Sequence, residues 1–280
     1  PAETPNKSPP RSSRPDSRAA SPSATSPTPP SSVSPLWSEP STIDASGKLI
    51  SPGFVNCHLH AGTNAPHVFM SDSTKADYFA ANFIAYAAGK RGTLDVRANA
   101  RVDVEQKFGI WAAIRGGATT VMDVGTRNPE AFVEMIDSLG ARMYMGPGYR
   151  SFEYFFDEDG RVQWDDNQAA GLQGLERAVA FAAEYDGALN DRIRCMLFPG
   201  QLDTCSEELL RATRRAADEH SLRISLHVAM NMVEFQRIMR EHRLTPIEYV
   251  QSIGFLGPDV ILGHCVFHNK HSWEIGRAHV

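Results

Sequence analysis

Four histidines stand at or near the carboxyl ends of short apolar segments that are typical of buried strands. His58 and His60 are two positions apart, and His227 and His264 each lie near the end of a later segment. Alternate residues of a strand face the same side, about 6.6 Å apart along the chain, so His58 and His60 can reach one ion. Imidazole is the commonest metal ligand in proteins, and an open Zn²⁺ or Fe²⁺ site lowers the pKa of bound water toward about 7. The pattern therefore predicts a metal-dependent hydrolytic site; the alternative is that each histidine only packs in the core or at its rim.

The segments that carry these histidines alternate with helical patterns. Predicted strands occupy residues 51–60, 118–124, 143–147, 192–198, 222–229 and 260–266. Predicted helices occupy residues 96–115, 129–139, 169–185, 206–219, 233–242 and 246–253, and a polar and aromatic loop fills residues 148–167. This alternation indicates an α/β fold with parallel strands. Six strands suit a doubly wound sheet, and a (β/α)8 barrel needs eight. Histidines at carboxyl strand ends favour the barrel, because barrel active sites form at that end.

Composition excludes several classes of protein. Hydrophobic residues make up 42% of the 280 residues and charged residues 22%, an ordinary globular balance. The net charge is −5 without a long basic run, so we expect no nucleic-acid partner. No apolar stretch approaches the ~20 residues of a membrane span, so we expect no membrane partner either. The four cysteines lack close pairing, which is typical of reduced thiols in a cytoplasmic protein.

The two ends of the chain differ from the middle. Residues 1–40 contain 11 Pro and 11 Ser, leaving too little apolar surface to offset chain entropy, and are predicted to be disordered. Residues 275–280 show neither a helix cap nor a strand pattern and are similar to a translated sequencing adapter. We interpret them as a non-native tail and leave His279 out of the site. Residues 41–274 then form the barrel domain.

Five motifs resemble, in the same order, those of the amidohydrolase superfamily. They are residues 43–50, 52–60 (PGFVNCHLH), 117–123, 226–229 and 262–264. The most similar branch contains cytosine deaminases, S-adenosylhomocysteine deaminases and triazine hydrolases. The resemblance implies a TIM-like (β/α)8 barrel with about six of its eight strands in this chain. Residues 43–50 are then a remnant of a small β-sandwich segment that precedes the barrel.

The resemblance also implies a role for each histidine. His58, His60 and His227 correspond to metal ligands, and His264 to the catalytic residue that hydrogen-bonds the metal-bound water or the substrate. Binuclear relatives carry a bridging lysine on strand four, and residues 192–200 contain none, so one ion is expected, Zn²⁺ or Fe²⁺. The fourth ligand of the family is an Asp that ends strand eight, which we do not find in this sequence.

One position departs from the deaminase pattern. Deaminases of this branch usually have Glu three residues after the fifth-strand histidine, where it shuttles protons. Met230 stands there, and a thioether has no proton to transfer. Glu234, expected in the next helix, is a poor substitute by geometry. We assign substrate contacts to Met230 and to His67 in the first loop.

These features predict a metal-dependent hydrolase that cleaves carbon–nitrogen bonds, other than peptide bonds, in a small nitrogen-rich and heterocyclic substrate. One alternative is a nucleobase or nucleoside aminohydrolase with another proton shuttle. The other is a metal-free barrel protein without catalysis. With strands seven and eight and one ligand missing, we expect this fragment itself to be inactive. Relatives are often homo-oligomers, and the sequence leaves a homo-oligomer open.

Overall fold

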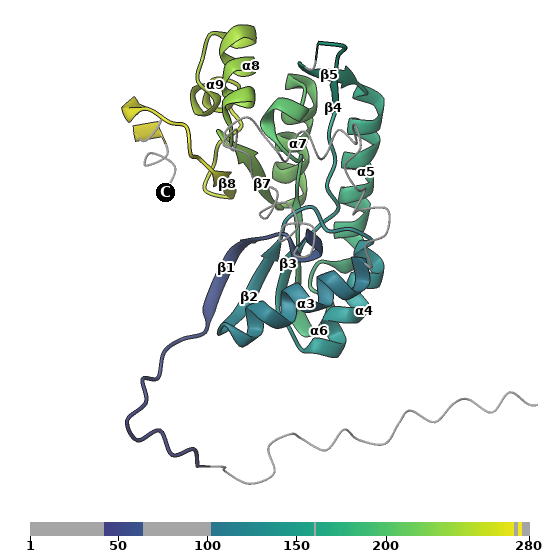
Figure 1. Ribbon diagram of the computed structural model, residues 1–280. Coiled ribbons are helices and arrows are strands. Elements are labelled where there is room, and N and C mark those ends of the chain that lie inside the picture. Colours follow the sequence, from purple (N-terminus) through teal and green to yellow (C-terminus); the bar gives the residue numbers. More distant parts are fainter. Residues whose placement is uncertain (1–41, 64–101, 160, 272–273, 276–280) are drawn as a thin grey trace, which may run out of the picture. The chain divides into compact units, whose positions relative to one another are not determined.

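The computed structural model describes residues 42–63, 102–159, 161–271 and 274–275 (Figure 1). The chain divides into two compact units, residues 1–50 and 51–280, and each is described here by itself. His67 lies outside the described residues, and so does the predicted disordered segment, residues 1–40. Of the predicted non-native tail, only residue 275 is described. Within the described ranges, none of the helices combines the length and the apolar character that a membrane span requires.

The described part of the first unit, residues 42–50, is a turn between extended arms. The N–H of Lys48 donates to the carbonyl of Ala45 at 2.9 Å, and Gly47 has φ +68°. No strand forms in residues 42–50. The β-sandwich remnant that the resemblance implies for residues 43–50 therefore contains no strand, because a tight turn interrupts the segment and a strand needs a partner for its backbone hydrogen bonds.

The second unit is built on a six-stranded sheet of parallel strands. The strands follow one another in chain order: β1 (Phe54–Leu59), β2 (Ala118–Asp123), β3 (Met143–Met145), β6 (Ile193–Leu197), β7 (Arg223–Val228) and β8 (Val260–His264). All six predicted strands are present. The parallel pairing places the carboxyl end of every strand at the same edge of the sheet, which is the geometry that a catalytic barrel needs.

Helices connect these strands and cover the sheet (Figure 1). They are α3 (Val102–Arg115), α4 (Pro129–Leu139), α5 (Gln168–Tyr185), α6 (Ala188–Asp191), α7 (Glu207–His220), α8 (Met232–His242) and α9 (Pro246–Ser252). Helix α3 packs against β2, α5 against β6 and α7 against β7. The strand–helix–strand repeat confirms the predicted α/β fold of barrel type.

Local sequence explains where the helices begin and end. The side-chain oxygen of Ser206 accepts the N–H of Leu209 at 3.1 Å, so Ser206 caps α7. Helix α4 has Pro129 in its first turn and ends at Gly140, whose φ of +67° lies in the left-handed region that favours glycine. These signals lie in residues at or next to the helix ends, so the helix ends could be predicted without knowledge of the fold.

A hairpin replaces the loop that was predicted for residues 148–167. Strand β4 (Phe152–Phe156) pairs antiparallel with β5 (Val162–Asp166). The turn is closed by Asp157, whose N–H donates to the carbonyl of Arg161 at 3.0 Å. The prediction of a loop is wrong because the aromatic run of β4 does not alternate between apolar and polar residues, so it lacks the period of a half-buried strand.

Candidate metal centre

Three histidine nitrogens converge at the carboxyl ends of β1 and β7. The Nε2 of His227 lies 3.2 Å from the Nε2 of His58 and 3.2 Å from the Nε2 of His60. These three side chains are the group of ligand atoms, among the described residues, whose spacing could hold a metal ion. The structure thus brings together the three histidines that the resemblance assigned as metal ligands.

Strand β1 and its neighbour β2 place two of these histidines. His58 and His60 share one face of the strand, and Cys57, the residue before His58, is exposed and faces the other side. Just beyond His60, the N–H of Ala61 donates to the carboxyl group of Asp123 at 2.8 Å. Asp123 is buried, and burial raises its pKa to about 6 against the lowering effect of hydrogen bonds. The buried carboxyl group of Asp123 thus holds the backbone that follows His60.

Strands β7 and β8 place the third histidine and leave room for the cluster. The N–H of His227 donates to the carbonyl of Gly200 at 3.1 Å, and His227 pairs in register with Gly263 of β8. A Cβ atom at Gly263 would come within 2.8 Å of the His58 ring and 3.3 Å of the His227 ring. Only glycine leaves this space for the imidazoles.

Burial favours the neutral form of His58 and His227. It lowers the pKa of His227 to about 2, and the neighbouring rings of His60, His264 and His58 lower it further. The pKa of His58 is lowered as well, first by burial and then by His264. Neutral imidazole has a free lone pair on one ring nitrogen, which is the form that binds a metal.

The geometry of the three nitrogens fits a single divalent ion such as Zn²⁺. Zinc–nitrogen bonds of 2.0–2.1 Å at tetrahedral angles separate the ligand nitrogens by about 3.3–3.4 Å, close to the two observed separations of 3.2 Å. Hydrogen bonds cannot replace the ion, because the Nε2 of His227 has one proton at most and faces two other nitrogens.

His264 lies beside the cluster but outside the group of three. Its ring stacks on that of His227 at a centroid distance of 4.9 Å and lies 5.1 Å from the ring of His58. Its side chain is exposed, although partial burial still lowers its pKa. A neutral imidazole there can accept a proton near the three histidines, which suits the separate role predicted for His264.

The other residues that the sequence singled out do not belong to the group of three histidines. Met230 lies in the turn between β7 and α8 and is half-buried. Glu234 belongs to α8, as expected, and has no exposed surface. Its two carboxyl oxygens accept the N–H groups of Ala229 and Met230, so it is engaged with backbone and is not available as a shuttle.

Sequence reasoning missed a second buried acid, Asp203. Its carboxyl group accepts the hydroxyl of Tyr154 at 2.7 Å and the indole N–H of Trp164 at 3.3 Å. Asp203 is 1% exposed, and burial raises its pKa to about 6. It lies in the one-turn helix η3 (Leu202–Thr204), and nothing in the sequence distinguishes it from a solvated aspartate.

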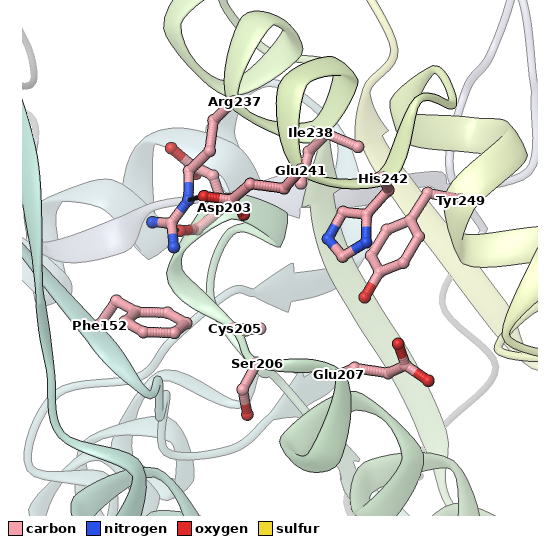
Figure 2. Close-up of a pocket in the computed structure, with 10 residues that line it drawn as sticks. All are labelled: Phe152, Asp203, Cys205, Ser206, Glu207, Arg237, Ile238, Glu241, His242 and Tyr249. Carbon is pink, nitrogen blue, oxygen red and sulfur yellow. Dashed lines mark hydrogen bonds and ion pairs between the residues drawn. The ribbon is translucent and has the colours of Figure 1, made fainter.

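A cavity of about 200 Å³ lies apart from the histidines (Figure 2). It is lined by Phe152 of the hairpin, by Asp203 of η3 and by side chains of α7, α8 and α9. The guanidinium of Arg237 stands at its wall, 4.6 Å from the Phe152 ring, and donates to the backbone carbonyl of Asp203 at 2.8 Å. None of its lining residues belongs to the histidine cluster, so the cavity is not assigned to the metal centre.

The sequence profile of the Amidohydrolase family matches residues 49–280. Over 233 residues the chain is 29% identical to the 5'-deoxyadenosine deaminase of Methanothermobacter thermautotrophicus, covering 83% of this chain and 49% of that protein. Over 225 residues it is 30% identical to the 5-methylthioadenosine/S-adenosylhomocysteine deaminase of Halobacterium salinarum, covering 80% and 48%. The chain therefore spans about half the length of the curated relatives it matches.

The fold is also found among solved structures. The crystal structure of atrazine chlorohydrolase from Arthrobacter aurescens, complexed with zinc, aligns with a TM-score of 0.59 at 17% identity. This alignment covers 80% of this chain and 51% of that one. It supports the barrel fold that the parallel sheet shows. The match over residues 49–280 covers more than half of the chain and shows its family. The chain belongs to the Amidohydrolase family.

Proposed function

We propose that the chain carries the metal site of a hydrolase that cleaves carbon–nitrogen bonds, other than peptide bonds, in a small nitrogen-rich heterocycle. The observation that carries this proposal is the convergence of three imidazole nitrogens at the carboxyl ends of β1 and β7. Family membership supports it, and so do the deaminase names of the two relatives. The substrate is a small molecule in this proposal.

His58, His60 and His227 would hold one divalent ion, Zn²⁺ or Fe²⁺. When bound, such an ion supplies Lewis-acid chemistry and lowers the pKa of a coordinated water toward about 7. The protein's own contribution is to keep the three imidazoles neutral and aimed at one point. Burial of His227 and the space left by Gly263 support this contribution.

His264 is the proposed general acid–base residue. Its ring stacks on His227 and is exposed, so a substrate can reach it. Because its pKa is lowered, the ring is neutral at pH 7; it can accept a proton at a ring nitrogen and return it to a leaving group. Met230 and His67 are proposed to contact substrate, and His67 lies outside the described residues.

The second candidate is an aminohydrolase that releases ammonia from a nucleoside or nucleobase. The names of both curated relatives favour it, and Met230 in the proton-shuttle position argues against it. We expect the variant Met230→Glu to increase ammonia release from 5'-deoxyadenosine if the chain is active, because a carboxyl group restores a proton donor. Unchanged ammonia release in an active chain would count against this candidate.

The first experiment is elemental analysis of the purified chain. We expect about one Zn²⁺ or Fe²⁺ per chain, removable by a chelator and restored by dialysis against the metal. A chain without stoichiometric metal after such dialysis would instead favour the metal-free barrel protein. Ammonia and chloride release from 5'-deoxyadenosine and a chloro-triazine, measured with a full-length homologue, would then distinguish the substrate classes.

We also propose a location for the chain and its assembly. All four cysteines are free thiols, which supports a cytoplasmic location. A homo-oligomer stays a prediction. Cell fractionation tests the location, and light scattering of the purified chain tests the assembly.

A further inference from the structure

One buried side chain holds the turn that follows His227. The carboxyl group of Glu234 accepts the N–H of Ala229 at 2.6 Å through one oxygen and the N–H of Met230 at 2.9 Å through the other. Glu234 is 0% exposed. Buried N–H groups need acceptors, and these two have theirs in a single side chain. The turn after β7 is therefore fixed from helix α8.

The start of α8 fixes Glu234 in return. The side-chain oxygen of Asn231 accepts the N–H of Glu234 at 2.9 Å and caps the helix. The turn thus contacts Glu234 through two backbone N–H groups and through one side chain. This arrangement leaves the carboxyl group little freedom to turn away.

The same turn also holds the segment that follows His264. The carbonyl of Ala229 accepts the N–H of Val266 at 3.0 Å and the N–H of Phe267 at 3.1 Å. His264 and Cys265 have φ values of +73° and +49°, a backbone region that is unfavourable for residues other than glycine. Such a backbone persists only where its surroundings hold it, and Ala229 supplies two of the contacts.

We propose that Glu234 is a positioning residue of the histidine cluster. Its carboxyl group fixes the turn after His227 and, through Ala229, the turn after His264. This inference rests on the proposed function, because the cluster it positions is the proposed metal site. Glu234 is not a catalytic residue in this account, since both of its oxygens are occupied by backbone N–H groups.

The chemistry of the side chain makes a sharp variant available. In Glu234→Gln, the side chain keeps its shape but has one oxygen, and its amide nitrogen is a donor that faces another N–H. One of the two backbone groups then loses its acceptor. The turn can no longer be held from both N–H groups at once.

Asp203→Asn is the matched control. Asp203 is as buried as Glu234, and its carboxyl group also accepts two hydrogen bonds, but these come from Tyr154 and Trp164 of the hairpin. The control therefore removes a buried acid whose carboxyl group accepts its hydrogen bonds from the hairpin and not from the turns after β7 and β8; its charge raises the pKa of Glu234, so its loss favours the ionised carboxylate there. Figure 2 shows Asp203 beside Arg237, on the side of the described cavity.

The test uses Co²⁺ as the probe, with the complete 280-residue chain and both variants, at pH 9, where the carboxyl group of Glu234 is ionised because the pH lies above its pKa of about 8. Co²⁺ affinity is measured by titration, and the visible absorption bands report the arrangement of the ligands. We expect Glu234→Gln to weaken Co²⁺ binding about 10- to 100-fold and to shift the bands, as changes just outside a metal's ligands do. We expect Asp203→Asn to keep both the affinity within about threefold and the spectrum. Unfolding midpoints of all three chains are measured alongside.

Each outcome separates the two proposals. A wild-type chain that binds no Co²⁺ and no Zn²⁺ contradicts the proposed function. A wild-type chain that binds Co²⁺, with a folded Glu234→Gln variant of equal affinity and equal spectrum, overturns the positioning role. If Glu234→Gln does not fold or no metal binds, hydrogen exchange of the wild-type amides tests the positioning role of Glu234. Slow exchange of the Ala229, Met230, Val266 and Phe267 amides supports the role, and fast exchange of the first two overturns it.

Discussion

At the scale of single residues, the cluster is organised around His227. It is the most buried of the four histidines, and its Nε2 faces two other imidazole nitrogens. We predict that His227→Ala reduces Zn²⁺ affinity by more than about 100-fold, since loss of an outer hydrogen-bond partner alone costs 10–100-fold. Competition with a chromophoric chelator measures this. His220→Ala, an exposed histidine at the end of α7, is the control and should bind Zn²⁺ as the wild type does.

A second prediction concerns Gly263, because a substitution at this position replaces none of the proposed ligands. In Gly263→Ala the new methyl group would stand 2.8 Å from the His58 ring, so the ring must move. We expect Zn²⁺ affinity to fall at least about tenfold while the far-ultraviolet circular dichroism stays that of the wild type. In the control Gly116→Ala, the new Cβ comes no closer than 3.3 Å to its neighbours. Equal affinity of Gly263→Ala and wild type would show that the ring positions are not needed for binding.

Sequence reasoning was strongest for the ligands and weakest for the residues that support them. His58 and His60 are visible from their spacing, and His227 and His264 from their place at strand ends. Glu234 and Asp203 are not visible in the sequence, because no local sequence pattern marks a carboxyl group that will be buried. The pattern Asn231-x-x-Glu234 predicts a capped helix, but the Glu side chain contacts N–H groups further back.

At the scale of elements, the β4–β5 hairpin depends on Asp203. The hydroxyl of Tyr154 donates to Asp203, and the guanidinium of Arg237 lies 4.3 Å from the Trp164 ring. We predict that Tyr154→Phe lowers the free energy of unfolding by about 1–3 kcal/mol, because it leaves a buried carboxyl oxygen with one partner fewer. Urea unfolding measures it. Tyr144→Phe is the control, whose hydroxyl only meets the exposed Arg223 at 3.4 Å, and a loss of equal size there would contradict the assignment.

The parallel strands and their helices could be predicted because each has its own local pattern. Pro129 and Gly140 bound α4, and Ser206 begins α7. The hairpin could not be predicted in this way. Its pairing is stabilised by contacts with Asp203 and Arg237, which belong to segments distant in sequence. Local patterns thus predict the sheet, while tertiary contacts decide the insertions between its strands.

At the scale of the whole molecule, buried titratable groups set the response to pH. Burial, followed by the neighbouring Asp203, raises the pKa of Glu234 to about 8 in the folded chain, whereas an unfolded glutamate titrates near 4.5. The folded state therefore binds more protons between these values, and stability falls as pH rises toward 8. From pH 7 to 8 this group alone gives a predicted loss on the order of 1 kcal/mol, which is partly offset because unfolded histidines still lose protons over this interval while the buried ones are already neutral.

Urea unfolding at pH 7 and pH 8, in the presence of a chelator, measures this loss. The Glu234→Gln variant has no titrating group at that position, so its stability should change less over the same interval. A wild-type chain whose unfolding free energy rises from pH 7 to pH 8 would contradict the prediction.

The order of the sheet has a practical consequence. Among the described residues, β1 pairs only with β2, and its Phe54 and Val55 are 63% and 68% exposed. A free strand edge with apolar side chains is a template on which another molecule can add its own strand. Concentrated stocks of the chain will therefore turn cloudy before dilute ones do. Metal titrations are best begun on freshly thawed, dilute samples.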